Sequence, residues 1–303
     1  MTRDPSSMNK SLGKWLISGP PVLYLVVFFV IPTLIMVLAS FRYAGEYGGL
    51  APVWLHDAQG AHLNLTFESY QEFFSDFIYS RLFIKTLIYA LITTFFCLLL
   101  AYPLALMIAR SERKHRDLLV LLVILPFWSN FLIRIYAWMI ILGPQSAFST
   151  ALSSFLGLFG LEPVRLLFTP FAVVVCLIYV QLPFMVLPLY ANLEKHDPAL
   201  LDAAQDLGAN VWQRFCRVTF PLSLPGIYAG VALVFVPVLG IFAVPDILGG
   251  TRGIMIGNLI KQEFLEARDW PFGSTLSIML TMGAMVIVGA AALVARRKGG
   301  ESV

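Results

Sequence analysis

The chain has 303 residues, of which 58% are apolar, 14% are aromatic and only 13% are charged, and its formal net charge is +3. Soluble domains carry about 25% charged residues, and a soluble core of this size could not bury so much apolar surface. The composition therefore argues against a water-soluble protein. The cysteines lie far apart with no C-x-x-C pair, which argues against a metal or redox framework.

Six apolar runs are long enough to cross a bilayer, whose core needs about 20 helical residues. The spans are expected at or within residues 15–41, 86–109, 118–142, 166–192, 226–248 and 272–294. The first run is too long for a cleavable signal peptide, so we expect an uncleaved span. The expected fold class is an all-α integral membrane protein with six transmembrane helices. Its membrane domain takes up residues 15–295, between terminal segments 1–14 and 296–303.

The distribution of Lys and Arg predicts the orientation of these spans. The N-terminus, residues 110–117, residues 191–226 and the C-terminus carry three, four, three and three of them, which makes 13 of the 21 in the chain. The opposite segments carry seven, and Arg134 lies within the third span. Because positive charge marks the cytoplasmic side, both termini and the 191–226 loop are expected in the cytoplasm.

The loop between the fourth and fifth spans predicts two short helices. Asp197 can cap the first helix, and Gly208 can end it in a left-handed turn. Asn210 and Gln213 have the spacing of a capping box for the second helix, which is expected to stop near Pro221. Such a pair can either seal the helix bundle at the interface or dock into a soluble partner.

The sequence Asp202-Ala203-Ala204, followed by Gly208, resembles the E-A-A–x3–G loop of bacterial ABC-importer permeases, with Asp in place of the usual Glu. Strings at 126–138, 182–190 and 254–273 resemble the permeases of putrescine and spermidine importers in particular. The resemblance implies the type I ABC importer permease fold. It also implies that the loop is a coupling helix, which contacts an ATPase through Asp202, Ala203, Ala204, Leu207 and Gly208.

The same resemblance implies a set of partners in the inner (plasma) membrane of a bacterium. These are a second homologous permease, a cytoplasmic ABC ATPase dimer that uses ATP and magnesium, a periplasmic solute-binding protein, the polyamine substrate and membrane lipid. Nucleic acid is not among them. The chain has no G-x-x-x-x-G-K-[ST] loop, so ATP hydrolysis is expected in a separate subunit. We expect a transport subunit without a cofactor or metal of its own. It is not expected to be an enzyme.

Two other classes of protein remain possible. A stand-alone secondary transporter of a small cation would often show two related halves with broken helices, but no clear internal repeat is visible. A membrane enzyme would need a catalytic set of residues, and none is visible. The helical cytoplasmic loop would be unexplained in a secondary transporter, and this observation favours the ABC permease.

Charged residues inside a bilayer are costly and usually functional. Asp246 follows Pro245 near the end of the fifth span, where a broken helix and a carboxylate can attract a polyamine cation. Asp246 can instead cap the following turn or pair with an arginine. Arg134 is expected near the outer interface, in a salt bridge or snorkelling to water, because it would repel a cationic substrate.

Aromatic rings and further carboxylates can also line a path for ammonium groups. The tentative path residues, besides Asp246, are Trp128, Tyr179, Glu263 and Trp270. Packing or a place in the interfacial belt is the alternative for each aromatic residue, and a solvated face is the alternative for Glu263.

Overall fold

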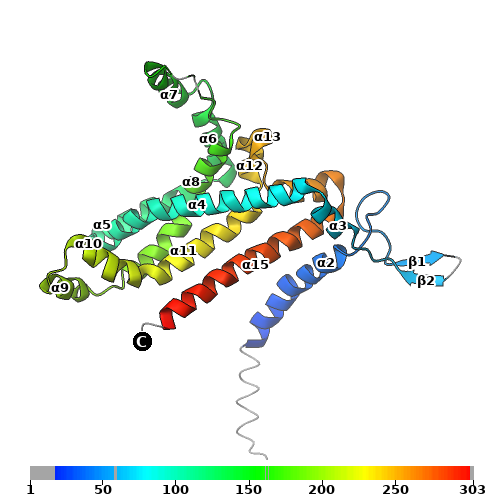
Figure 1. The fold of residues 1–303 in the computed structure, drawn as a ribbon, viewed down its shortest axis with the longest axis horizontal. Coiled ribbons are helices and arrows are strands. Elements are labelled where there is room, and N and C mark those ends of the chain that lie inside the picture. The colour runs from blue at the N-terminus through cyan, green and yellow to red at the C-terminus, as the bar shows by residue number, and fades with distance from the viewer. Residues whose placement is uncertain (1–17, 58–59, 161, 163, 301–303) are drawn as a thin grey trace, which may run out of the picture. The chain divides into compact units, whose positions relative to one another are not determined.

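The computed structural model describes residues 18–300, apart from 58–59, 161 and 163. The expected polar N-terminus and the start of the first span therefore lie outside the described residues. The chain, whose elements are labelled in Figure 1, divides into two compact units. One consists of Met1–Phe77 and Ile260–Met282, and the other consists of Ile78–Leu259 and Gly283–Val303.

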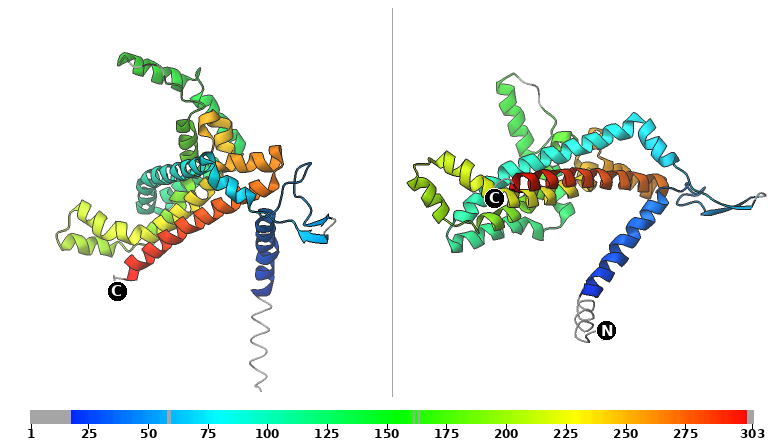
Figure 2. Two further views of the ribbon diagram at one scale, coloured as in Figure 1. Left: turned by 45° about the vertical axis from the view of Figure 1, so that its right-hand side comes forward. Right: turned by 60° about the horizontal axis from the view of Figure 1, so that its bottom comes forward.

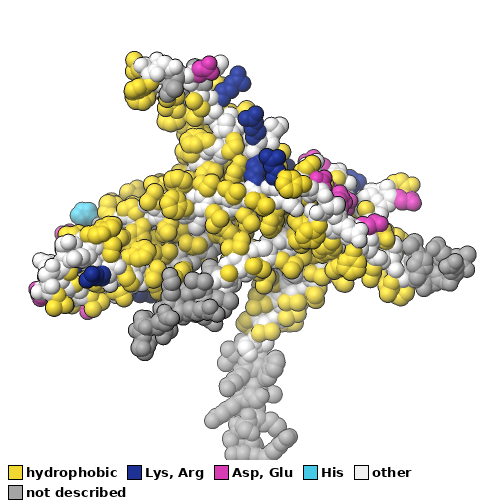
Figure 3. Space-filling model, viewed as in Figure 1, with side chains coloured by type: hydrophobic (Ala, Val, Ile, Leu, Met, Phe, Trp, Pro, Cys, Tyr) yellow, Lys and Arg dark blue, Asp and Glu magenta, His cyan; other side chains and the backbone are white. Residues whose placement is uncertain are grey.

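Within the described part of the chain, six helical stretches are long and apolar enough to cross a membrane. They are Ser18–Ala39, Phe77–Arg110, Phe131–Leu158, Pro170–Leu193, Val211–Gly240 and Trp270–Ala290. Apolar side chains cover much of the visible helix surface (Figure 3), as expected for helices surrounded by lipid. The number of spans and the all-helical membrane architecture are confirmed.

The first unit joins the beginning and the end of the chain. Its elements are η1 (Val26–Val30), α2 (Ile31–Ala39), β1 (Trp54–Asp57), β2 (Gly60–Leu63), α3 (Glu68–Ser75), η4 (Glu263–Ala267) and the start of α15 (Trp270–Gly300). The two strands form a small antiparallel hairpin. The Ser40 hydroxyl lies 2.8 Å from that of Tyr70, and the Thr275 hydroxyl donates to the Ser40 carbonyl at 3.4 Å. These bonds fasten α3 and α15 to the end of α2.

The second unit holds the remaining helices. They are most of α4 (Phe77–Arg110), α5 (Arg113–Ile124), η2 (Leu125–Trp128), α6 (Phe131–Leu142), α7 (Ala147–Leu158), α8 (Pro170–Leu193), α9 (Ala199–Asp206), α10 (Val211–Arg214), η3 (Phe215–Thr219), α11 (Phe220–Gly240), α12 (Ala243–Leu248), α13 (Gly250–Gly253), most of α14 (Ile256–Gln262) and the end of α15. The centre is the packing of α8 against α11. A Cβ atom at Gly226 would lie 2.7 Å from the Asn192 Cβ, and one at Gly230 would lie 2.6 Å from the Met185 sulfur. These glycines let the two helices approach closely.

The third span differs from its prediction, because residues 118–142 do not form one helix. The chain leaves η2 at Ser129, which is extended, and α6 starts anew after Asn130. The Asn130 side chain accepts a 2.8 Å hydrogen bond from the Leu132 N–H. Ser and Asn favour such caps over helix interiors, which explains the break. A helix, α7, also lies in the segment between the expected third and fourth spans.

The fifth span also has different bounds. It begins before residue 226 and ends at Gly240, so that the interruption lies at Ile241 and Phe242 and not at Pro245. Pro245 belongs to the first turn of α12, where its missing N–H removes no helical hydrogen bond.

The prediction that the second loop helix stops near Pro221 was wrong. The Phe220 N–H donates to the Phe215 carbonyl in a π turn, and α11 follows with Pro221 in its first turn. A proline ring clashes with the carbonyl four residues earlier, and the wider π turn accommodates it. The same arrangement, with η1, precedes Pro32 in the first span. Residues Val211–Gly240 are thus one continuous helical stretch (Figure 2).

Candidate functional site

The helix α9 begins and ends with the predicted local contacts. The Asp197 carboxylate accepts a 2.9 Å hydrogen bond from the Ala199 N–H at the start of the helix. Gly208 has a φ of +82°, and the Ala209 N–H donates to the Ala204 carbonyl at 3.0 Å. This is the Schellman arrangement, which satisfies a carbonyl at the helix end and needs a residue that tolerates the left-handed region.

The second helix, α10, starts with the predicted capping box. The Gln213 N–H donates to the Asn210 side chain at 2.8 Å, and the Asn210 N–H donates to the Gln213 side chain at 2.9 Å. Beyond this box the Arg214 guanidinium donates to the Gln205 side-chain oxygen at 2.7 Å. The two short helices are therefore joined both by the glycine turn and by a side-chain bond. We call α9, the turn and α10 the α9–α10 segment.

The residues expected to contact an ATPase lie on one end of α9 and on the turn. Asp202 and Ala203 are exposed, and Leu207 is 89% exposed, while Ala204 is half-buried. A Cβ atom at Gly208 would meet nothing within 4 Å. An exposed leucine beside small side chains offers apolar area that a partner can cover.

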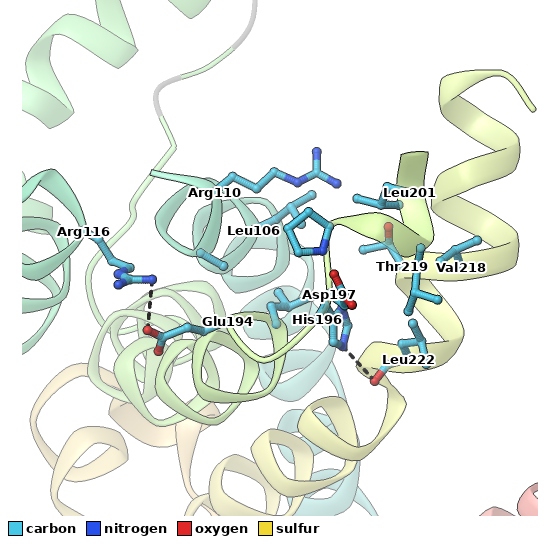
Figure 4. Close-up of a pocket in the computed structure, with 14 residues that line it drawn as sticks. Leu106, Arg110, Arg116, Glu194, His196, Asp197, Leu201, Val218, Thr219 and Leu222 are labelled. Carbon is cyan, nitrogen blue, oxygen red and sulfur yellow. Dashed lines mark hydrogen bonds and ion pairs between the residues drawn. The ribbon is translucent and has the colours of Figure 1, made fainter. Parts of the chain in front are cut away.

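A pocket of about 480 Å³ lies behind α9 (Figure 4). Its lining comes from the ends of α4 and α8, from Arg116 of α5, from α9 and from η3 and α11. Arg116 forms a 2.9 Å ion pair with Glu194, and the His196 ring lies 3.2 Å from the Leu222 carbonyl. Neither contact was predicted from the sequence. Opposite charges on two segments assigned to the same side were the only available signal for the ion pair.

A second hollow of about 440 Å³ adjoins the first. Both hollows are lined by Leu106, Arg110, Leu201 and Thr219. Trp212 lies at the second hollow, stacked on Phe215 with 5.6 Å between ring centres. Leu201 thus anchors the α9–α10 segment to the helix ends and lines both hollows.

Asp246 is exposed on α12, and its carboxylate accepts a hydrogen bond from Asn258 of α14, a partner that was not predicted. The Asn258 side chain, only 7% exposed, donates from Nδ2 to the Asp246 carboxylate and, at 2.9 Å, to the Phe242 carbonyl. Its Oδ1 accepts a 3.0 Å hydrogen bond from the Met255 N–H. The start of α14 is therefore bonded to Phe242, in the break that separates α11 from α12, and to Asp246 of α12.

Gly257 brings the two backbones together at this break. A Cβ atom there would lie 2.8 Å from the carbonyl oxygens of Gly240 and Ile241. These carbonyls belong to the end of α11, where the helix dipole is negative and the last carbonyls have no helical partner. A carboxylate and a negative helix end thus lie within a few residues of each other, which is an arrangement that attracts cations.

Arg134 differs from the expectation of a salt bridge or of snorkelling. It is 9% exposed, and its guanidinium lies 4.7 Å from the centre of the Phe127 ring and 5.8 Å from that of Phe131. Among the described residues its Nε has no hydrogen-bond partner. Phe127 precedes the break before α6 and Phe131 follows it, and the faces of both rings stabilise the cation.

The remaining path candidates belong to different units. Trp128 is 75% exposed at the end of η2, and Tyr179 packs edge-on against Trp138 with 5.6 Å between ring centres. Glu263 and Trp270 belong to the other unit. Burial raises the pKa of Glu263, and the negative charges of Asp269 and Glu72 raise it further.

Residues 101–298 match the family described as "Binding-protein-dependent transport system inner membrane component". The chain belongs to this family. Relatives of this transport component include the spermidine/putrescine transport system permease protein PotB of Haemophilus influenzae, 43% identical over 86% of each chain. The PotB of Escherichia coli is 42% identical over 88% of this chain and 92% of its own.

A crystal structure of a bacterial alginate ABC transporter, in complex with an alginate pentasaccharide-bound periplasmic protein, contains a chain with the same fold. The TM-score is 0.75, the identity is 20%, and the match covers 98% of each chain.

Proposed function

We propose that this chain is a permease subunit of an ABC importer that moves spermidine and putrescine into the cytoplasm. The observation that carries the substrate class is the identity of 42–43% to spermidine/putrescine permeases over nearly the whole chain. In this proposal a second permease completes the pore, a periplasmic solute-binding protein delivers the substrate, and a separate ATPase dimer consumes ATP and magnesium.

The α9–α10 segment is the proposed contact with that ATPase. Its exposed Leu207 and small neighbouring side chains suit a cleft, and its continuation through η3 into α11 supports a rigid connection to the membrane. Both termini and this segment lie in the cytoplasm in the proposed orientation, as the distribution of Lys and Arg favours. Movement of the segment then alternates the access of the pore.

Asp246 is the proposed contact with the cationic substrate in this chain. Its support is the exposed carboxylate beside the negative end of α11, at a break in the fifth span. The aromatic residues Trp128, Tyr179 and Trp270 and the carboxylate of Glu263 remain weaker candidates, because none of them is placed beside the break in the fifth span, and Tyr179 packs against Trp138.

Uptake in cells tests this function. The chain and its partner subunits are expressed in a bacterial strain that lacks its own polyamine importers, and uptake of labelled spermidine is measured. We expect saturable uptake that unlabelled putrescine inhibits and that neutral oligosaccharides leave unchanged. Absence of polyamine uptake by an assembled transporter would contradict the proposed substrate.

A further inference from the structure

We propose that Asn258 is the positioning residue that sets the place of the Asp246 carboxylate for cation binding. This inference rests on the proposed function, in which Asp246 contacts the substrate. Asn258 itself is buried and does not contact the substrate in this proposal. It acts on the substrate through the carboxylate to which it donates.

The orientation of the Asn258 amide is fixed by its three partners. The Phe242 carbonyl and the Asp246 carboxylate can only accept, and the Met255 N–H can only donate. A flipped amide would place its oxygen against two acceptors and its NH₂ group against a donor. The NH₂ group therefore points at the carboxylate.

The position of Asn258 is also fixed by the backbone around it. Gly257, the preceding residue, lies against the Gly240 and Ile241 carbonyls at a distance that leaves no room for a Cβ atom. Ile256, two residues before Asn258, donates its N–H to the Thr86 hydroxyl at 2.9 Å. The beginning of α14 is thus attached to α4 and to the end of α11, and it presents a rigid donor to α12.

The consequence for cation binding is a more ordered carboxylate. A hydrogen bond from a buried amide restricts the rotamers of the carboxylate that accepts it. Fewer side-chain rotamers are then lost when a cation binds, which raises affinity. The Asn258 NH₂ group donates to both the Asp246 carboxylate and the Phe242 carbonyl, so it also keeps the carboxylate close to the break that follows α11.

The test compares uptake of spermidine by the assembled transporter in four variants, with the amount of transporter in the membrane measured for each. In Asp246→Asn the carboxylate is lost. In Asn258→Asp the acceptor for the Met255 N–H remains, but the donor becomes a second carboxylate. The double variant D246N/N258D exchanges the two groups, so that one amide and one carboxylate again face each other. Asn64→Asp is the matched control, because Asn64 is also buried and its side chain donates to the Pro52 carbonyl.

We expect D246N and N258D each to raise the half-saturating spermidine concentration by about tenfold, the order of one charge-assisted hydrogen bond. The double variant should bind spermidine no better than D246N, because its one carboxylate then lies at the buried position 258, and N64D should leave half-saturation unchanged. A purely structural Asn258 would instead lower the amount of transporter or its maximal rate in N258D, with half-saturation unchanged.

The two proposals fail in different ways. If D246N raises the half-saturating concentration and N258D does not, Asp246 keeps its role and the positioning role of Asn258 is overturned. If D246N leaves half-saturation unchanged, the contact between Asp246 and the substrate is overturned, and the positioning role falls with it.

Discussion

The Arg214 guanidinium donates a 2.7 Å hydrogen bond to the Gln205 side chain and so joins α10 to α9 across the turn at Gly208. From Arg214 the chain continues through η3 into α11 without leaving the helical conformation. A displacement of α9 is therefore carried to α11 by two routes, the backbone of the turn and this side-chain bond. We expect the bond to matter for coupling more than for stability, since an exposed hydrogen bond contributes only about 1 kcal/mol.

The first prediction concerns this bond. Arg214→Ala and Gln205→Ala should each increase the ATP hydrolysed per spermidine imported, because the two helices then move less as one body. The double variant should be no worse than either single variant, since both remove the same bond. Arg217→Ala, which removes an equal charge from the exposed surface of η3, is the control. Additive losses in the double variant would show that the two residues act separately.

The second prediction concerns the turn at Gly208. Gly208→Val should strongly reduce uptake while insertion into the membrane persists. A side chain there finds open space but must adopt a φ of +82°, which costs about 1–2 kcal/mol or more for a β-branched residue. Gly208→Asn should retain more uptake, because Asn tolerates this region. Gly157→Val is the matched control, since Gly157 also faces open space but has an ordinary φ. Normal uptake by Gly208→Val would argue against a role for the turn.

The third prediction concerns Arg134. Arg134→Ala should lower the thermal stability of the complex, because the Phe127 and Phe131 rings lose the cation that contacts them, a contact of about 0.5–2 kcal/mol. The half-saturating spermidine concentration should stay unchanged if Arg134 serves the helix break alone. Thermal unfolding of the purified complex and uptake kinetics measure the two effects. An increase in affinity for spermidine would instead indicate that Arg134 repels the substrate.

The fourth prediction concerns the pH dependence caused by Glu263. Its pKa in the folded chain is raised above the ordinary 4.5, first by burial and then by Asp269 and Glu72. The folded state therefore holds this proton more tightly, and stability falls as the pH rises from about 4.5 through the raised pKa. Glu263→Gln should be more stable than the original chain above that interval and equal to it below 4.5. Melting curves at several pH values measure this, and Glu266→Gln, at an exposed neighbour, is the control.

Local patterns in the sequence were sufficient for the α9–α10 segment. The Asp197 cap, the Gly208 turn and the Asn210–Gln213 box involve residues two to five positions apart, and the structure confirms each of them. The continuation through Pro221 was not predictable from the same rules, because a π turn accommodates the proline and leaves no mark in composition. Proline alone was therefore a misleading stop signal.

The surroundings of the path candidates were less predictable. Asp246 was recognisable as a charge within an apolar run, whereas its partner Asn258 lies twelve residues later, between the expected fifth and sixth spans. Their contact depends on the fold of α12, α13 and α14. Arg134 was likewise recognisable, but its ring partners became apparent only once the third span proved to be broken before Phe131.

The dependence of uptake on a separate ATPase tests the central proposal most directly. The complete complex is placed in liposomes with ATP and magnesium on the side of the α9–α10 segment, and the loaded binding protein is added on the opposite side. We predict spermidine uptake that requires ATP and stops when the catalytic residues of the ATPase are substituted. Uptake that continues with the inactive ATPase, driven by an ion gradient alone, would contradict the proposal and favour a secondary transporter.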